Sequence, residues 1–302
     1  MRFRPLGNSG VVVSVISLAL AESNRNRPQD WEALVYCALE HGINSFEVTG
    51  RHPAIAEGLS MAVHAIERRL ACVTWRLGNS YDAEGRPMRD FSADALEHAV
   101  MSILARTGFS YLDAVVLDEP RARELDIDAL NRLKALRAAG RVRLLGVAGQ
   151  DEAIDAYIST GVFDLLHMPY SILSGWKERL RQQAAADHNM AVTSYDYYPD
   201  RLRRGQGGLP VKGAAGKAAH PLAGVGTYAF LDSTPGWTGE GIALSHAMTN
   251  PALASLQIVT DRPERIAALT AVVERDLPSG VPAQIEMARF AQAAADRGGR
   301  RA

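Results

Sequence analysis

The stretch Ile127–Gly149, IDALNRLKALRAAGRVRLLGVAG, contains one complete helix-to-strand unit. Asp126 precedes it as a predicted helix N-cap, and the amphipathic run Ile127–Ala139 is typical of a helix that packs one face against a core. Gly140 predicts the end of this helix, because glycine readily adopts the left-handed conformation found after a helix C-terminus. The short apolar run Arg143–Ala148 follows at once and predicts a buried strand.

The same alternation repeats along the whole chain. Its 302 residues fit one α/β barrel, so we predict a single domain, 1–302. Helix-like runs such as Trp31–Glu40 and Ala93–Leu104 separate shorter apolar runs, which favours a (β/α)8 TIM barrel over an open sheet. The predicted strands are Val15–Leu20, Ile43–Val48, Ala71–Leu77, Leu112–Leu117, Arg143–Ala148, Phe163–Met168, Ala191–Tyr195 and Ala254–Val259.

Charge and hydrophobicity exclude several classes of partner. The formal net charge is -1, which indicates neither a nucleic-acid partner nor an anionic membrane surface. No stretch reaches the ~18 consecutive apolar residues that a membrane-spanning helix needs. The run Val11–Ala21 imitates a secretory signal, but Ser14 and Ser17 interrupt it, and we interpret it as a buried strand. We therefore predict a cytoplasmic protein.

Residues 200–240 are rich in Gly, Pro and Ala and show no clean periodicity, which predicts a long basic loop after the seventh strand. Two interpretations stay open for it: a solvated, flexible segment, or a clamp for a phosphate or carboxylate group at the barrel mouth. The tail 298–302 is predicted to be disordered. The cations of the loop are Arg201, Arg203, Arg204, Lys212 and Lys217.

Six short phrases spread over nearly the whole chain resemble those of one enzyme family. They are Arg4–Gly10, Ala38–Phe46, Ser110–Asp113, Leu133–Gly146, Met168–Leu173, and Asn250–Pro251 with Arg262–Arg265. In this order they are similar to the aldo/keto reductases. The resemblance implies a (β/α)8 barrel with an N-terminal β-hairpin, and hydride transfer from a nicotinamide cofactor to a carbonyl group.

The resemblance also implies a catalytic tetrad of Asp, Tyr, Lys and His, and the chain departs from it first in strand two. The family motif F-D-T-A-x-x-Y-G reads FEVTGRHP at residues 46–53. Glu47 therefore stands in place of the Asp, and His52 in place of the Tyr that acts as general acid. A histidine donates a proton only when it is charged, which requires a different pH range from a tuned tyrosine.

The chain departs from the tetrad again in strands three and four. The motif T-K-x-G reads WRLG, which puts Arg76 in place of Lys, and L-H-x-P reads LDEP, which puts Asp118 in place of His. No lysine precedes Lys134, so the first four strands contain none. Arginine stays charged at any working pH and cannot relay a proton.

The four replaced positions all keep polar side chains and are the candidate catalytic residues. Glu47 and Arg76 are predicted to form a buried ion pair, and His52 with Asp118 an oriented acid/base couple. They would lie at the carboxyl ends of the strands, where barrel enzymes carry out their chemistry. Further residues expected to line the same mouth and to bind substrate are Trp75, His167 and Tyr195.

The cofactor motifs of the family are also altered. Ala148-Gly149 replaces the Ser-Asn after strand five, and Asp261 stands where a cation would meet a 2′-phosphate. Tyr195 matches the aromatic residue that stacks on nicotinamide. If NADP(H) or NAD(H) binds, Tyr195, Arg262 and Arg265 are the expected contacts, but these changes do not favour either cofactor.

Three functions remain open on the sequence, and whether the protein is an enzyme is one of the open points. The first is a repurposed acid/base enzyme or binder that holds a small molecule at the barrel mouth, with His52 and either Asp118 or Glu47 in proton transfer. The second is a non-catalytic protein that binds a metabolite or a partner. The third is an oxidoreductase with a variant tetrad. No spacing typical of metal ligands occurs, so no metal site is predicted, and nothing indicates the oligomeric state.

Overall fold

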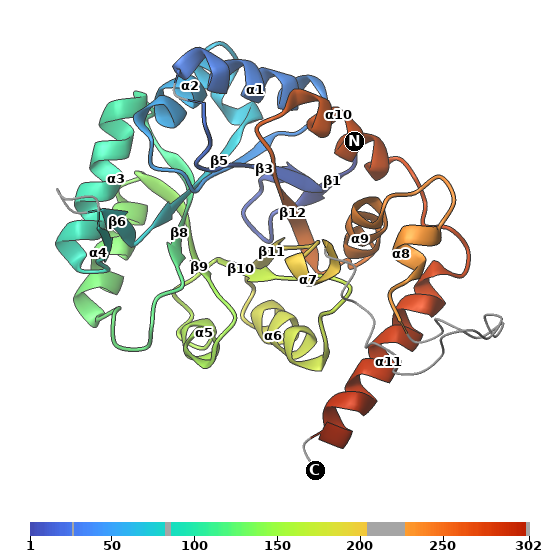
Figure 1. Ribbon diagram of the computed structural model, residues 1–302. Helices are drawn as coiled ribbons and strands as arrows, with labels where there is room; N and C mark the ends of the chain where they lie inside the picture. The colour runs from blue at the N-terminus through green and yellow to red at the C-terminus, as the bar shows by residue number, and fades with distance from the viewer. Residues whose placement is uncertain (26, 82–85, 204–226, 300–302) are drawn as a thin grey trace, which may run out of the picture.

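The computed structural model describes residues 1–25, 27–81, 86–203 and 227–299. Parallel strands close into a barrel of eight, with helices packed around it (Figure 1), so the predicted (β/α)8 barrel is confirmed. Each predicted strand agrees with an observed one to within two residues at either end. The barrel strands are β3 Ile16–Leu20, β4 Ser45–Val48, β5 Cys72–Leu77, β8 Leu112–Asp118, β9 Val142–Ala148, β10 Leu165–Pro169, β11 Ala191–Tyr195 and β12 Leu253–Val259.

Helix α3 begins and ends at the capping residues that its sequence suggests, whereas α1 begins at Pro28, three residues before its predicted start. The side chain of Ser92 accepts a hydrogen bond from Ala95 N–H at the start of α3, and α3 ends at Gly108, whose φ is 68°. No helix in the described part of the chain is long and apolar enough to cross a membrane. The helices are α1 Pro28–Glu40, α2 Pro53–His64, α3 Ala93–Thr107, α4 Ile127–Ala138, α5 Glu152–Ile158, α6 Trp176–Asp187, α7 Asp200–Arg203, α8 Phe230–Ser233, α9 Gly239–Met248, α10 Pro263–Val273 and α11 Val281–Gly299, with a 3-10 turn at Arg68–Leu70.

In the described part of the chain, two antiparallel hairpins lie outside the barrel, and the first closes its lower end. Strands β1 Phe3–Pro5 and β2 Val12–Ser14 bring Leu6 and Val13 against the apolar residues at the bottom of the barrel interior. The guanidinium of Arg4 donates to backbone carbonyls just before and at the start of β12, which fixes the hairpin in place. The second hairpin, β6 Asn79–Tyr81 with β7 Pro87–Arg89, follows β5.

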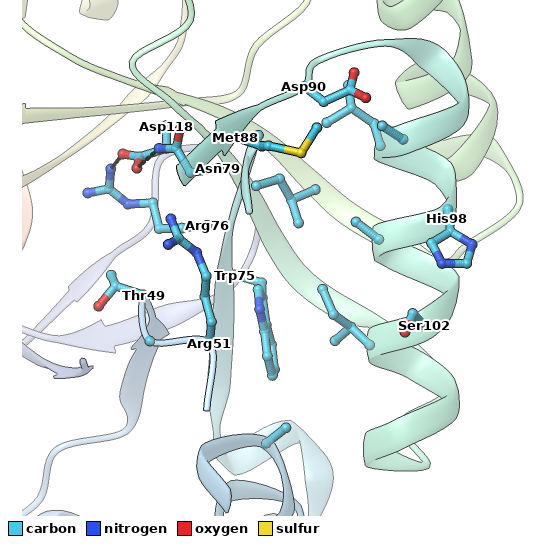
Figure 2. A pocket seen from close by; sticks show the side chains of 18 of the residues that line it. Thr49, Arg51, Trp75, Arg76, Asn79, Met88, Asp90, His98, Ser102 and Asp118 are labelled. Carbon is cyan, nitrogen blue, oxygen red and sulfur yellow. Dashed lines mark hydrogen bonds and ion pairs between the residues drawn. The ribbon is translucent and has the colours of Figure 1, made fainter. Parts of the chain in front are cut away.

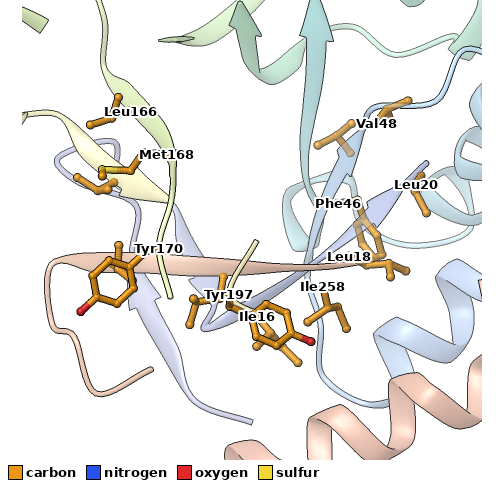
Figure 3. Close-up of a cluster of buried hydrophobic side chains, with 14 of the residues drawn as sticks. Ile16, Leu18, Leu20, Phe46, Val48, Leu166, Met168, Tyr170, Tyr197 and Ile258 are labelled. Carbon is orange, nitrogen blue, oxygen red and sulfur yellow. The ribbon is translucent and has the colours of Figure 1, made fainter. Parts of the chain in front are cut away.

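The main core lies between the barrel and its helices. Side chains of a strand point alternately to its two faces, so every second barrel residue faces outward. On β3 and β4 these are large apolar residues, which pack together with others from β10 and β12 (Figure 3). The labelled members on these strands are Ile16, Leu18, Leu20, Phe46, Val48, Leu166, Met168 and Ile258.

The inward-facing residues of the barrel are unusually polar. TIM barrels commonly fill their interior with bulky branched side chains. Here a layer of hydroxyl side chains lies above the apolar bottom layer, and acidic, basic and amide side chains lie above that. The hydroxyl layer surrounds a small internal cavity and consists of Ser17, Ser45, Thr74, Thr193 and Ser255.

Two predictions about irregular segments need correction. Residues 200–240 are not one continuous loop, because α7 and α8 lie in this range and α9 begins at its end. Residues 204–226, including Arg204, Lys212 and Lys217, lie outside the described residues, so the clamp interpretation stays a prediction. The predicted disordered tail is wrong for residues 298 and 299, which belong to α11; residues 300–302 lie outside the described part.

Candidate functional site at the barrel mouth

Arg76 lies between two carboxylates at the mouth of the barrel. Its Nε donates to Glu47 Oε1, and its Nη1 donates to Asp118 Oδ1 over 2.5 Å. The other carboxylate oxygens are also occupied: Gln257 Nε2 donates to Glu47 Oε2 over 2.6 Å, and Asn79 Nδ2 donates to Asp118 Oδ2 over 2.5 Å. The Glu47–Arg76 pair expected from the sequence is therefore present, and it is part of a larger network.

Burial makes this network strongly coupled. Glu47 is 5% exposed, and the side chain of Arg76 is 12% exposed. Burial alone would raise the pKa of Glu47, but its interactions with His167, Arg76 and Gln257 outweigh this and lower it. Burial would likewise lower the pKa of Arg76, but Glu47 and Asp118 raise it. Each group thus stays charged because the other is charged.

His167 and Tyr195 extend the network across the barrel. Burial lowers the pKa of His167 to about 4, so its ring is neutral near pH 7. Its Nδ1 lies 2.7 Å from the Thr193 hydroxyl, and its Nε2 lies 3.6 Å from Glu47 Oε2. The ring stacks on Tyr195 with 4.8 Å between centroids, and the Arg76 guanidinium lies 5.5 Å from the same Tyr195 ring. Two protein side chains, His167 and Arg76, therefore already contact the Tyr195 ring.

The predicted couple of His52 with Asp118 is wrong. His52 is the N-cap of α2, and its Nδ1 accepts a hydrogen bond from Ala54 N–H over 3.2 Å. Its backbone N–H donates to the carboxylate of Glu22. Asp118 is already paired with Arg76 and Asn79. His52 is exposed at the rim, and no carboxylate in the described residues orients its imidazole.

An open cavity of about 880 Å³ begins at this network, within the usual size range of ligand sites. In Figure 2, Arg76, Asn79 and Asp118 lie at one side of the cavity and helix α3 at the other. Of the predicted substrate-binding residues, Trp75 lines this cavity, whereas His167 lines only the small internal one. Other residues that line the large cavity include Thr49, Arg51, His52, Met88, Asp90, Leu96, His98, Ala99, Ser102, Ile103 and Arg106.

Comparison with solved structures identifies the architecture. An aldo-keto reductase from Bacillus halodurans superposes with a TM-score of 0.77 at 18% identity, covering 95% of each chain. The glycerol dehydrogenase AKR11B4 from Gluconobacter oxydans superposes with a TM-score of 0.70 at 15% identity, covering 94% of each chain. This chain has the aldo-keto reductase fold. No family model and no curated protein sequence matches it.

The residues at the expected cofactor positions of this aldo-keto reductase fold do not fit a dinucleotide phosphate well. Arg265 donates twice to the carboxylate of Glu240, which also accepts from the Tyr197 hydroxyl. Asp261 places a carboxylate at the position that the resemblance assigns to a 2′-phosphate, and Arg25 contacts both its backbone carbonyl and, at 4.0 Å, its carboxylate. Arg262 alone has no side-chain partner among the described residues. Of the two cations that the sequence assigned to a cofactor, Arg265 is thus already neutralised by Glu240.

Three residues of the site could not be assigned from the sequence motifs. Gln257 and Asn79 donate hydrogen bonds to the two carboxylates. Of these two residues, only Gln257 had a signal in the sequence, namely its inward-facing position on β12. Glu119 adopts a φ of 54°, which is rare for a residue with a side chain, and its carboxylate accepts from Tyr195 over 3.3 Å. Strained backbone of this kind often lies near functional sites. Within the described residues, no group of three or more His, Cys, Asp or Glu is placed to hold a metal ion.

Proposed function

We propose that this protein binds a small organic molecule at the barrel mouth and does not catalyse nicotinamide-dependent carbonyl reduction. The observation that carries the proposal is the position of Arg76, which bridges Glu47 and Asp118 where the family resemblance implies a Lys. Reduction of a carbonyl by hydride requires a proton donor beside the developing alkoxide. The resemblance implies a Tyr donor tuned by that Lys, and here His52 replaces the Tyr. An arginine held by two carboxylates keeps its protons, so it can orient an oxygen but cannot share a proton with a donor.

The mouth offers hydrogen-bonding groups to a ligand. Arg76 has N–H groups beyond the two that its carboxylate partners use, and Thr49 contributes a hydroxyl to the same cavity. The side chain of Asp118 is 30% exposed and has acceptor capacity left for a ligand hydroxyl or amine. These groups suit a polar ligand that both accepts and donates hydrogen bonds.

Proton-transfer catalysis on the bound ligand is the second candidate function. The exposed imidazole of His52 favours it, since its Nδ1 accepts from Ala54 N–H and its Nε2 is then the protonated nitrogen that faces away from the helix. Once a substrate is found, His52→Ala should reduce turnover by more than about tenfold. A smaller loss would remove His52 from the mechanism and leave binding as the function.

A ligand screen tests the proposal. Small metabolites would be ranked by the rise in melting temperature that they cause, and the dissociation constants of the hits measured by calorimetry. Asn79→Ala should weaken the hits by about tenfold, because it releases Asp118 from its fixed position. Asn131→Ala on α4, exposed and not among the residues that line the cavity, is the control. Hits that Asn79→Ala and Asn131→Ala affect equally would place binding elsewhere and contradict the proposal.

A further inference from the structure

Trp75 does not face the barrel axis. On β5 its neighbours Thr74 and Arg76 point inward, so Trp75 points outward, toward the helices, and packs at the edge of the main core. It is only partly buried and lines the large cavity. Its indole N–H has no hydrogen-bond partner among the described residues. Part of the cavity therefore lies outside the barrel, between β5 and α3, and away from the Arg76 network (Figure 2).

Helix α3 forms the opposite wall with two parallel rows of side chains. Residues four apart lie on the same face of a helix. One row is apolar, with Ala95, Ala99 and Ile103, and the other is polar, with His98, Ser102 and Arg106. Ala95 and Ala99 are small, and their size leaves the space in front of Trp75 open. We call this space, lined by Trp75 and the two rows, the α3 groove.

The α3 groove is long and has a cation at its far end. Arg106 lies eleven positions after Ala95, which corresponds to about 16.5 Å along the helix axis. Arg106 is exposed, lines the groove, and has no partner among the described residues. The acidic residue Asp90 precedes the N-terminus of α3, and its carboxylate accepts a hydrogen bond from Ser92 N–H. The groove thus has an acidic residue at one end, an apolar middle and a cation at the far end.

We propose that the α3 groove binds an elongated organic anion, with a flat apolar ring system against Trp75 and Ile103 and an oxyanion group at Arg106. Indole faces and aliphatic side chains bind flat rings well, and a guanidinium pairs with carboxylate, sulfonate or phosphate oxygens alike. The inference rests on the proposed function, because the groove is continuous with the mouth. It adds the class of ligand, and it names residues that the mouth network does not contain.

Biphenyl-4-carboxylate is a suitable probe, with biphenyl-4-methanol as its neutral counterpart. Quenching of tryptophan fluorescence and calorimetry would measure both affinities for the intact protein. We expect saturable binding of the carboxylate with a dissociation constant below about 1 mM, and about tenfold weaker binding of the alcohol. Equal affinity for the two would overturn the assignment of an anion, and absence of carboxylate binding would overturn the groove.

Two pairs of variants locate the probe. Ala99→Phe fills the groove and should abolish binding, whereas Ala105→Phe, the same change at an exposed position of α3 outside the cavity, should not. Arg106→Gln should reduce the affinity for the carboxylate to that for the alcohol, and Arg123→Gln, at an exposed site, should leave it unchanged. The Arg106 pair still decides the question if Ala99→Phe does not fold. Unchanged affinity in Arg106→Gln would overturn the inference.

The variants distinguish a failure of the proposed binding in the α3 groove from a failure of the proposed binding at the mouth. Probe binding that is lost in Ala99→Phe but kept in Asn79→Ala supports the groove independently of the mouth network. Binding that is lost in Asn79→Ala and kept in Ala99→Phe overturns the groove and leaves the proposed function standing.

Discussion

Replacing Arg76 by methionine removes the charge that holds the mouth network together while keeping a long side chain. Glu47, 5% exposed, would lose its cationic partner and keep only its contacts with Gln257 and His167. Leaving one member of a buried ion pair unpaired costs about 3–5 kcal/mol. The side chain of Asp118 is more exposed and keeps Asn79, so its loss adds little. We expect Arg76→Met to lower the free energy of unfolding by about 4 kcal/mol.

The charge of Glu47 is the reason for this cost, so removing that charge should reverse most of it. The double variant Glu47→Gln with Arg76→Met should unfold within about 1–2 kcal/mol of the wild type. The cost should also depend on pH. In the wild type the pKa of Glu47 is lowered, so its charge stabilises the fold at pH values above its unfolded pKa, and this contribution is lost as the pH falls through the folded value. Without Arg76 the carboxyl protonates more readily, so the gap between variant and wild type should narrow in acid.

Urea unfolding followed by circular dichroism, at pH 7 and pH 5, measures these quantities for the wild type, both single variants and the double variant. A loss below about 1 kcal/mol in Arg76→Met would refute the reasoning, because the pair would then contribute no more than an exposed one. A double variant no more stable than Arg76→Met would refute it as well, since the cost could not then come from the unpaired charge.

Two further predictions concern stability. Burial lowers the pKa of His167 from 6.5 to about 4, so the unfolded chain takes up a proton that the folded protein does not; stability should fall by up to roughly 3 kcal/mol between pH 6.5 and 4, and a flatter acid profile in His167→Gln checks this. Gly78→Ala should cost more than about 2 kcal/mol, because a Cβ there would lie 1.9 Å from Phe91 at a φ of 101°. Gly140 also has a positive φ, but a Cβ there would meet open space, so Gly140→Ala is the control. Equal melting temperatures for the two variants would contradict the steric argument.

The barrel could be predicted from the sequence because each strand is a short apolar run and most are followed by an amphipathic helix. The Glu47–Arg76 pair could be predicted because both residues are near the ends of adjacent strands and carry opposite charges. Whether His52 pairs with Asp118 could not be predicted from the strand positions alone. The pairing depends on whether Arg76 or His52 reaches the Asp118 carboxylate. Arg76 is long enough to reach Asp118 from the neighbouring strand, whereas the helix start fixes His52 at the rim.

The sequence contained the information that Trp75 lies on the outer face of its strand, although it was expected to line the barrel mouth. Its position between Thr74 and Arg76 on a strand puts it on the opposite face from both. A residue at the barrel mouth should share the register of Arg76, and Trp75 does not. The cavity beside it depends on Ala95 and Ala99 in a helix some 20 residues later, and no local pattern connects the two segments.

Titration of the purified protein with NADPH and NADH by calorimetry, in buffer without phosphate, tests whether the altered site still binds a nicotinamide cofactor. The Arg76 network and the pairing of Arg265 with Glu240 predict no saturable heat for either dinucleotide below about 1 mM. Micromolar binding of either one, together with oxidation of the cofactor in the presence of a carbonyl compound, would contradict the account and restore carbonyl reduction as the function.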